Sequence, residues 1–180
     1  MSHFPYHTTE TATGEAKELL DTINTGYGFV PNLFGYMAEA PATLKAYLQL
    51  NTLLAETSFT GAQLQVALLK VSLLNKCDFC AVAHQAMAKK FSSNEQSVQA
   101  VLDDSVIEDT QYKAIITVIT SIVNNKGWTP AEDLQAFWDA GFTQKHYLEL
   151  ILVVTIKTLS NYINHQTTPE VNPELLSMIS

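Results

Sequence analysis

The chain has 180 residues, which is enough for one domain with a substantial buried core. Apolar residues make up 47% of it and charged residues 16%, a balance that excludes a disordered chain and is typical of a compact globular protein. Its 10 Lys and Arg against 18 Asp and Glu give a formal net charge of −8, which disfavours nucleic acid and anionic membrane surfaces as partners.

Two segments bear on the cellular location. The first residues, MSHFPYHTTET, lack the charged and apolar regions of a signal peptide, and the apolar run LELILVVTI (148–156) is too short to span a bilayer. We therefore expect a cytoplasmic protein without a membrane partner. In a reducing compartment, two cysteines in one Cys-x-x-Cys indicate redox or metal chemistry rather than a disulfide framework.

Almost every segment beyond residue 14 has a helical period, and no convincing strand alternation is found. The Gly- and Pro-containing segment 26–32 is expected to be a loop packed against the core. The sequence therefore predicts an all-α fold in a single domain covering 1–180. The expected helices are 15–25, 41–55, 61–75, 77–91, 94–103, 109–125, 130–140 and 144–164.

Several of these helices have clear end signals. TGAQ (60–63) and SNEQ (93–96) have the form of capping boxes, and TPAE (129–132) places a proline at the first helical position. Gly127 and Gly141 stand where helices are expected to end.

A weak internal repeat links segments 59–71 and 142–154, since both open with Phe-Thr and continue into an apolar helix. Aligned with a shift of one residue, they place Gln65 opposite Glu149, and asparagines fall where the first copy has its cysteines. Two apolar helices can also match in this way by chance. An internal two-fold duplication and a coincidence therefore both stay open.

Both cysteines of the chain lie in the segment NKCDFCAVAHQ (75–85). On a helix, Cys77, Cys80 and His84 would share one face, with the thiols one turn apart. Such thiols can form a disulfide, and the imidazole can exchange a proton with the thiol as it becomes a nucleophilic thiolate. Attack on a peroxide would give a sulfenic acid, which the second thiol resolves to a disulfide.

Two other interpretations of this motif stand beside redox chemistry. Buried cysteines can pack as small apolar residues next to a hydrogen-bonded core histidine. A zinc site is the second, but only three ligands are visible and a closed structural site needs four. His165 or an acidic residue would have to complete it from elsewhere in the chain.

Three segments of the chain resemble the carboxymuconolactone decarboxylase and alkyl hydroperoxidase D superfamily, particularly its peroxidase-related branch. GFVPNLFGYMAEAPATLKAYL (28–48) resembles its first segment, and LLNKCDFCAVAH (73–84) its active-site segment. GFTQKHYLELILVVTIKTLSNYINH (141–165) is similar to its C-terminal half. The resemblance implies an all-helical alkyl hydroperoxidase D-like domain.

The resemblance also implies roles for individual residues. Cys80 would meet the peroxide, Cys77 would resolve it and exchange with the reductant, and His84 would belong to the proton relay. The family's relay glutamate, twelve residues before the first cysteine, is Gln65 here. An amide cannot gain and lose a proton near neutral pH. Glu149 is the candidate substitute, and a capping or solvated carboxylate is its alternative role.

The sequence thus predicts a thiol-dependent peroxidase or thiol–disulfide oxidoreductase that reduces alkyl hydroperoxides in antioxidant defence. It would need no metal or organic cofactor, and a thioredoxin- or lipoyl-type dithiol would supply electrons. The resemblance implies a homo-oligomer, a trimer or a hexamer. The alternatives are a disulfide reductase with little peroxidase activity, a redox-sensing or zinc-binding module, and a carboxymuconolactone decarboxylase-like enzyme. Phe29 and Phe34 are expected to make core or subunit contacts, and the alternative is that they line an apolar entrance to the thiols.

Overall fold

The computed structural model describes residues 3–179, and within that range it contains helices and no strand. The all-α prediction is therefore confirmed. The helices are α1 (Gly14–Tyr27), α2 (Asn32–Met37), α3 (Pro41–Leu54), α4 (Gly61–Leu74), α5 (Asp78–Lys90), α6 (Glu95–Leu102), α7 (Thr110–Asn124), α8 (Ala131–Asp139), α9 (Gln144–Thr167) and α10 (Pro173–Ile179). None of the described helices has the length and apolar character needed to cross a membrane.

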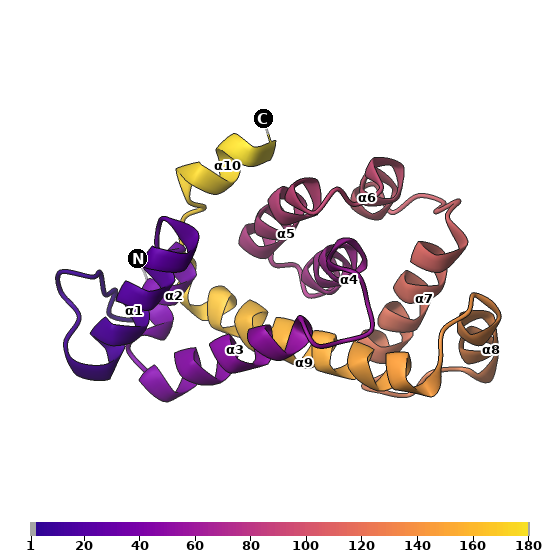
Figure 1. Ribbon diagram of the computed structural model, residues 1–180, viewed down its shortest axis with the longest axis horizontal. Helices are drawn as coiled ribbons and strands as arrows, with labels where there is room; N and C mark the ends of the chain where they lie inside the picture. The colour runs from indigo at the N-terminus through magenta and orange to yellow at the C-terminus, as the bar shows by residue number, and fades with distance from the viewer. Residues whose placement is uncertain (1–2, 180) are drawn as a thin grey trace.

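Helix α4 lies at the centre of the fold. It packs against α5, α6, α7 and α9, with α1 to α3 at one end of the molecule and α8 at the other (Figure 1). A helix that is apolar on every side has to be buried on every side. That explains the position of α4, in which every residue from Val66 to Ser72 is buried.

The turn from α4 to α5 places the cysteine motif. Helix α4 begins with the expected capping box, in which Thr60 and Gln63 each accept a hydrogen bond from the other's backbone N–H. After α4 ends, Lys76 takes a left-handed conformation with φ of 56°, and the backbone N–H of Cys77 donates to the carbonyl of Ser72 at 2.9 Å. Cys77 is therefore the N-cap of α5 and lies just before the helix.

Two short helices were not expected. Residues 32–37 form α2, whose Leu33, Phe34 and Met37 are buried, and α10 packs against α5 near the C-terminus (Figure 1). Six or seven residues are too few to show a helical period, so packing rather than local pattern stabilises them.

Two of the expected helix starts are displaced by one residue. Asn94, rather than Ser93, caps α6 by accepting from the backbone N–H of Ser97, and Ser93 instead donates to the carbonyl of Ala62. Pro130 is the N-cap of α8 and not its first residue.

The internal duplication does not hold in the expected register. Helix α9 runs without a break from Gln144 to Thr167, whereas the first copy is interrupted by the turn between α4 and α5. The aligned leucines also differ, because Leu64 is 7% exposed and Leu148 is 68% exposed. The similarity of the two segments is that of two apolar helices.

Candidate thiol redox site

Cys77 and Cys80 lie at the N-terminus of α5 and are joined by a disulfide, with their Cα atoms 5.3 Å apart. Both residues are 1% exposed. A helix N-terminus carries partial positive charge, which favours a thiolate over a thiol once the disulfide is reduced. The geometry suits a pair that cycles between disulfide and dithiol.

A cavity of about 540 Å³ reaches Cys80 but is not lined by Cys77. Most of its walls are apolar, and Phe29 and Phe34 are among them, as expected for an apolar entrance. Gln65, His84 and Lys157 add polar groups to the same cavity. Within the described residues, no Asp or Glu lines it. The two cysteines therefore face different surroundings.

His84 lies one turn beyond Cys80 and is held at both ring nitrogens. Its Nδ1 is 2.9 Å from Oε1 of Gln65, and its Nε2 is 2.8 Å from Nζ of Lys157. The amide oxygen of Gln65 can only accept a hydrogen bond, so Nδ1 carries the proton. Nε2 then holds the lone pair and accepts from the amine of Lys157.

The surroundings favour the neutral form of both bases. His84 is half-buried and lines the cavity, and burial together with the charge of Lys157 holds its pKa well below 6.5. Lys157 is 3% exposed, and burial lowers its pKa from 10.5 to about 7. The lysine is therefore the member of the pair that can gain or lose a proton near neutral pH.

A second contact from α9 steadies the turn before the motif. Nδ2 of Asn75 donates to Oδ1 of Asn161 at 3.0 Å, and Asn161 is fully buried. Lys157 and Asn161 are one turn apart on α9, so the same face of this helix supports both the turn and the imidazole.

Comparison with known proteins finds a family match over the segment that carries the cysteines. The model of the carboxymuconolactone decarboxylase family matches residues 41–108, which include both cysteines, His84 and Gln65 but not Lys157. This segment is therefore similar to the carboxymuconolactone decarboxylase family. No curated protein matches.

Solved structures show the same fold at low sequence identity. An uncharacterized peroxidase-related protein with an alkyl hydroperoxidase D core, from Ralstonia eutropha JMP134, is 19% identical with a TM-score of 0.83, covering 99% of this chain and 97% of its own. A peroxidase-related protein from Silicibacter sp. TM1040 is 18% identical with a TM-score of 0.79, and the match covers 92% of this chain and 89% of that protein. The debrominase Bmp8 is 13% identical with a TM-score of 0.76, and the match covers 99% of this chain and 97% of that protein.

Glu149 does not join the cavity, contrary to the role expected for it as a substitute for the family's glutamate. Its carboxylate accepts from the backbone N–H of Ser58 at 2.9 Å and lies 3.6 Å from Nζ of Lys145. It therefore links the loop before α4 to the second turn of α9, where it is neither a relay member nor a solvated carboxylate. The expectation depended on the repeat register, and the structure does not keep that register.

Lys157 is the site residue that the sequence analysis missed. It stands on α9 among buried positions such as Val153, Ile156 and Ser160. A lysine inside an apolar helical face was the available signal. His165 is exposed in the last turn of the same helix, and its ring lies 6.1 Å from that of Tyr162. Over residues 3–179, no group of three His, Cys, Asp or Glu side chains is arranged to hold a metal.

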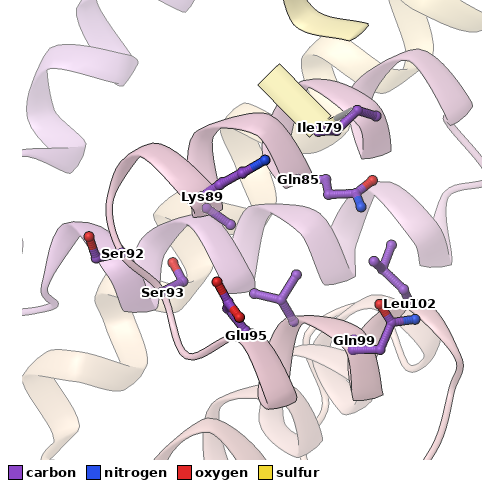
Figure 2. A pocket seen from close by; sticks show the side chains of 10 residues that line it. Gln85, Lys89, Ser92, Ser93, Glu95, Gln99, Leu102 and Ile179 are labelled. Carbon is purple, nitrogen blue, oxygen red and sulfur yellow. The ribbon is translucent and has the colours of Figure 1, made fainter. Parts of the chain in front are cut away.

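A second pocket of about 460 Å³ lies on the other side of α5, between that helix, α6 and α10. Figure 2 shows polar side chains around it, among them Gln85, Lys89 and Glu95. None of the residues of the thiol site lines this pocket. It is therefore separate from the chemistry at Cys80.

Proposed function

We propose that the protein is a thiol-dependent oxidoreductase that reduces organic hydroperoxides through the Cys77–Cys80 pair. One observation carries the proposal: Cys80 faces a large apolar cavity together with His84, whereas its disulfide partner does not. The superfamily and its peroxidase-related structural neighbours support the same class of chemistry.

The cycle begins with reduction by a dithiol donor. A donor thiolate attacks the sulfur of Cys77, forming a mixed disulfide and releasing Cys80 as a thiolate. The second donor thiol then attacks the mixed disulfide, which frees Cys77 and leaves the donor oxidised. Two electrons have entered the pair.

The thiolate of Cys80 then attacks one oxygen of the hydroperoxide. A sulfur–oxygen bond forms, the oxygen–oxygen bond breaks, and the leaving alkoxide takes a proton from the buried pair of His84 and Lys157. The resulting sulfenic acid is attacked by the thiol of Cys77, which restores the disulfide and releases water.

The cavity favours a substrate with a substantial apolar body. Burial of hydrocarbon against its walls contributes binding energy in proportion to the apolar area removed from water. Hydrogen peroxide offers no such area. We therefore propose organic hydroperoxides as the preferred class.

A second candidate is reductive removal of a halogen from a small aromatic ring. One structural neighbour is a debrominase in complex with 2,3,4-tribromopyrrole, and rings such as those of Phe29 and Phe34 suit a flat substrate. The pair would supply two electrons: a carbon–bromine bond becomes a carbon–hydrogen bond, the dithiol becomes a disulfide, and bromide leaves.

The two candidates are separated by one set of assays. Cumene hydroperoxide, hydrogen peroxide and 2,3,4-tribromopyrrole are each supplied with dithiothreitol, dihydrolipoamide or reduced thioredoxin, and loss of substrate is followed. We expect turnover of cumene hydroperoxide that disappears in Cys80→Ser. Turnover of tribromopyrrole alone would support the second candidate, and turnover of none would contradict both.

We further propose that the protein works as a homo-oligomer. Large apolar side chains are exposed at Trp128 and Val106, which are 82% and 73% accessible. Apolar surface of this kind is commonly covered by association. Sedimentation equilibrium should show a species of three or six chains, and a monomer at micromolar concentration would contradict this.

A further inference from the structure

Among residues 3–179, no carboxylate lines the cavity that contains the imidazole of His84. The titratable groups that line it are Tyr27 from α1, Tyr47 from α3, Lys157 from α9, and Cys80, His84 and Lys90 from α5. Over residues 3–179, α2, α4 and α10 add uncharged residues to the cavity and α7 adds none. A proton acceptor or donor for thiol chemistry has to come from this short set.

Most of these titratable groups are unsuited to exchange a proton with the thiol. Burial raises the pKa of Tyr47 beyond the physiological range, and burial likewise raises the pKa of Tyr27. Lys90 is exposed at the end of α5. His84 has one nitrogen committed to Gln65 and the other to Lys157. Lys157 is therefore the buried group that can still change its charge.

The hydrogen bonds also fix the direction in which Lys157 acts. Because Gln65 accepts from Nδ1 of His84, Nε2 can only accept, and the amine of Lys157 has to donate. An ammonium has three N–H donors, and the imidazole takes one of them. The imidazole thus holds the amine in place while the amine keeps protons for another acceptor.

A buried thiolate needs such a partner. Cys80 is 1% exposed, and an anion in these surroundings is costly unless a cation lies nearby. Lys157 lines the same cavity and is the buried group there that can become a cation. Reduction of the disulfide would therefore draw a proton onto Lys157 as the thiolate forms.

We propose that Lys157 is the proton-holding group of the thiol site and replaces the carboxyl that Gln65 cannot supply. The inference rests on the proposed thiol chemistry at Cys80. In the peroxide step, the Cys80 thiolate, the hydroperoxide and the Lys157 ammonium become the sulfenic acid, an alcohol and the neutral amine. Sulfur is oxidised by two electrons, the oxygen–oxygen bond is reduced, and the ammonium proton ends on the alcohol.

The direct test measures the pKa of the Cys80 thiol. In a Cys77→Ser background, Cys80 is the single thiol, and its alkylation by iodoacetamide is followed as a function of pH. Lys157→Met should raise the midpoint of this profile by about one pH unit or more and slow alkylation at neutral pH about tenfold. Lys89→Met, which removes a cation from the other side of α5, should leave the midpoint in place.

A second variant separates charge from proton transfer. Lys157→Arg keeps the cation but cannot release a proton, so the midpoint should stay low while turnover of hydroperoxide falls by about 10²-fold or more. Lys157→Met is expected to fold, because an apolar chain of similar length relieves the burial of a charge, and its melting curve checks this. An unchanged midpoint in Lys157→Met, or wild-type turnover in Lys157→Arg, would overturn the inference.

The alkylation profile needs no substrate, so it distinguishes this inference from the proposed function. A shifted midpoint in a protein that reduces none of the substrates leaves the Lys157 assignment standing and removes the function. Efficient peroxide turnover with an unshifted midpoint would leave the proposed function standing and remove the Lys157 assignment.

Discussion

Nζ of Lys157 lies 2.8 Å from Nε2 of His84, although 73 residues separate them in the sequence. The contact joins the long helix α9 to the helix that carries the cysteines. It places a base with a pKa of about 7 beside an imidazole whose pKa is well below its ordinary value. A buried pair of this kind has consequences for stability as well as for chemistry.

The oxidised protein should become more stable as the pH rises from about 7 to about 9. Burial holds the pKa of Lys157 at about 7 in the folded state against 10.5 in the unfolded state, so the unfolded chain binds more protons in this window. The contribution of neutral Lys157 to stability is fully present above its unfolded pKa of 10.5. It is lost as the pH falls to its folded pKa of about 7. The expected gain in unfolding free energy is about 2 kcal/mol.

Urea unfolding at both pH values measures this effect. In Lys157→Met, the unfolding free energy should be nearly the same at the two pH values. If it is also the same in the wild type, Lys157 keeps its ordinary pKa. Below 6.5 a further loss is expected as the buried His84 is forced to take up a proton, since its folded pKa is also depressed.

Gln65→Glu should move the pH profile of turnover upward. A carboxylate at this position accepts from Nδ1 of His84, stabilises the charged forms of the imidazole and of Lys157, and so raises the pKa of both. We expect higher peroxide turnover above neutral pH. Gln65→Met is the matched control, because it keeps the length of the side chain but removes the acceptor, and it should lower turnover. Equal profiles for the three proteins would count against the relay.

Ala83→Leu should discriminate between substrates by size. Ala83 lines the cavity one turn beyond Cys80, so a larger side chain there occupies space that an apolar substrate needs. The KM for cumene hydroperoxide should rise about tenfold, while the slow reaction with hydrogen peroxide should stay the same. Gln85→Leu adds apolar bulk on the other side of the same helix and should change neither. Equal effects on both peroxides would contradict a substrate site in this cavity.

Reductant should open the disulfide without unfolding the domain. The pair closes a very short loop, so its chain-entropy contribution to stability is small. We expect dithiothreitol to expose two thiols with nearly unchanged helical circular dichroism, and chelator to leave the melting temperature unchanged. A marked drop with chelator and no effect of reductant would favour the zinc-binding alternative, because binding energy at a structural zinc is folding energy.

The local sequence pattern was sufficient to predict the larger helices and the placement of the cysteine motif. The spacing of Cys77, Cys80 and His84 places them together at the start of α5 and along its face, and the Thr60 cap fixes where α4 begins. Resemblance to the superfamily identified Gln65 as the residue beside the imidazole, and the structure shows that contact. The motif and the cap each depend on residues within one helix, and Gln65 and His84 lie on consecutive helices.

The remaining features depend on contacts between distant segments. Lys157 looked like the end of an apolar run, and its partner is reached only because α9 and α5 both pack against α4. Glu149 was assigned from a repeat register that α9 does not keep, because it is one unbroken helix. Helices α2 and α10 are too short to show a period, and burial stabilises them.

In the proposed cycle, Cys80 is the nucleophile and Cys77 is its resolving partner. Reduced wild type, Cys77→Ser and Cys80→Ser are treated with one equivalent of cumene hydroperoxide in the presence of dimedone, and the adducts are located by mass spectrometry. We predict a sulfenic acid adduct on Cys80 in the Cys77→Ser protein, a disulfide in the wild type, and no adduct in Cys80→Ser. Catalytic turnover should be lost in both variants. An adduct on Cys77 in Cys80→Ser, or unreacted thiols in all three proteins, would contradict these roles of the two cysteines.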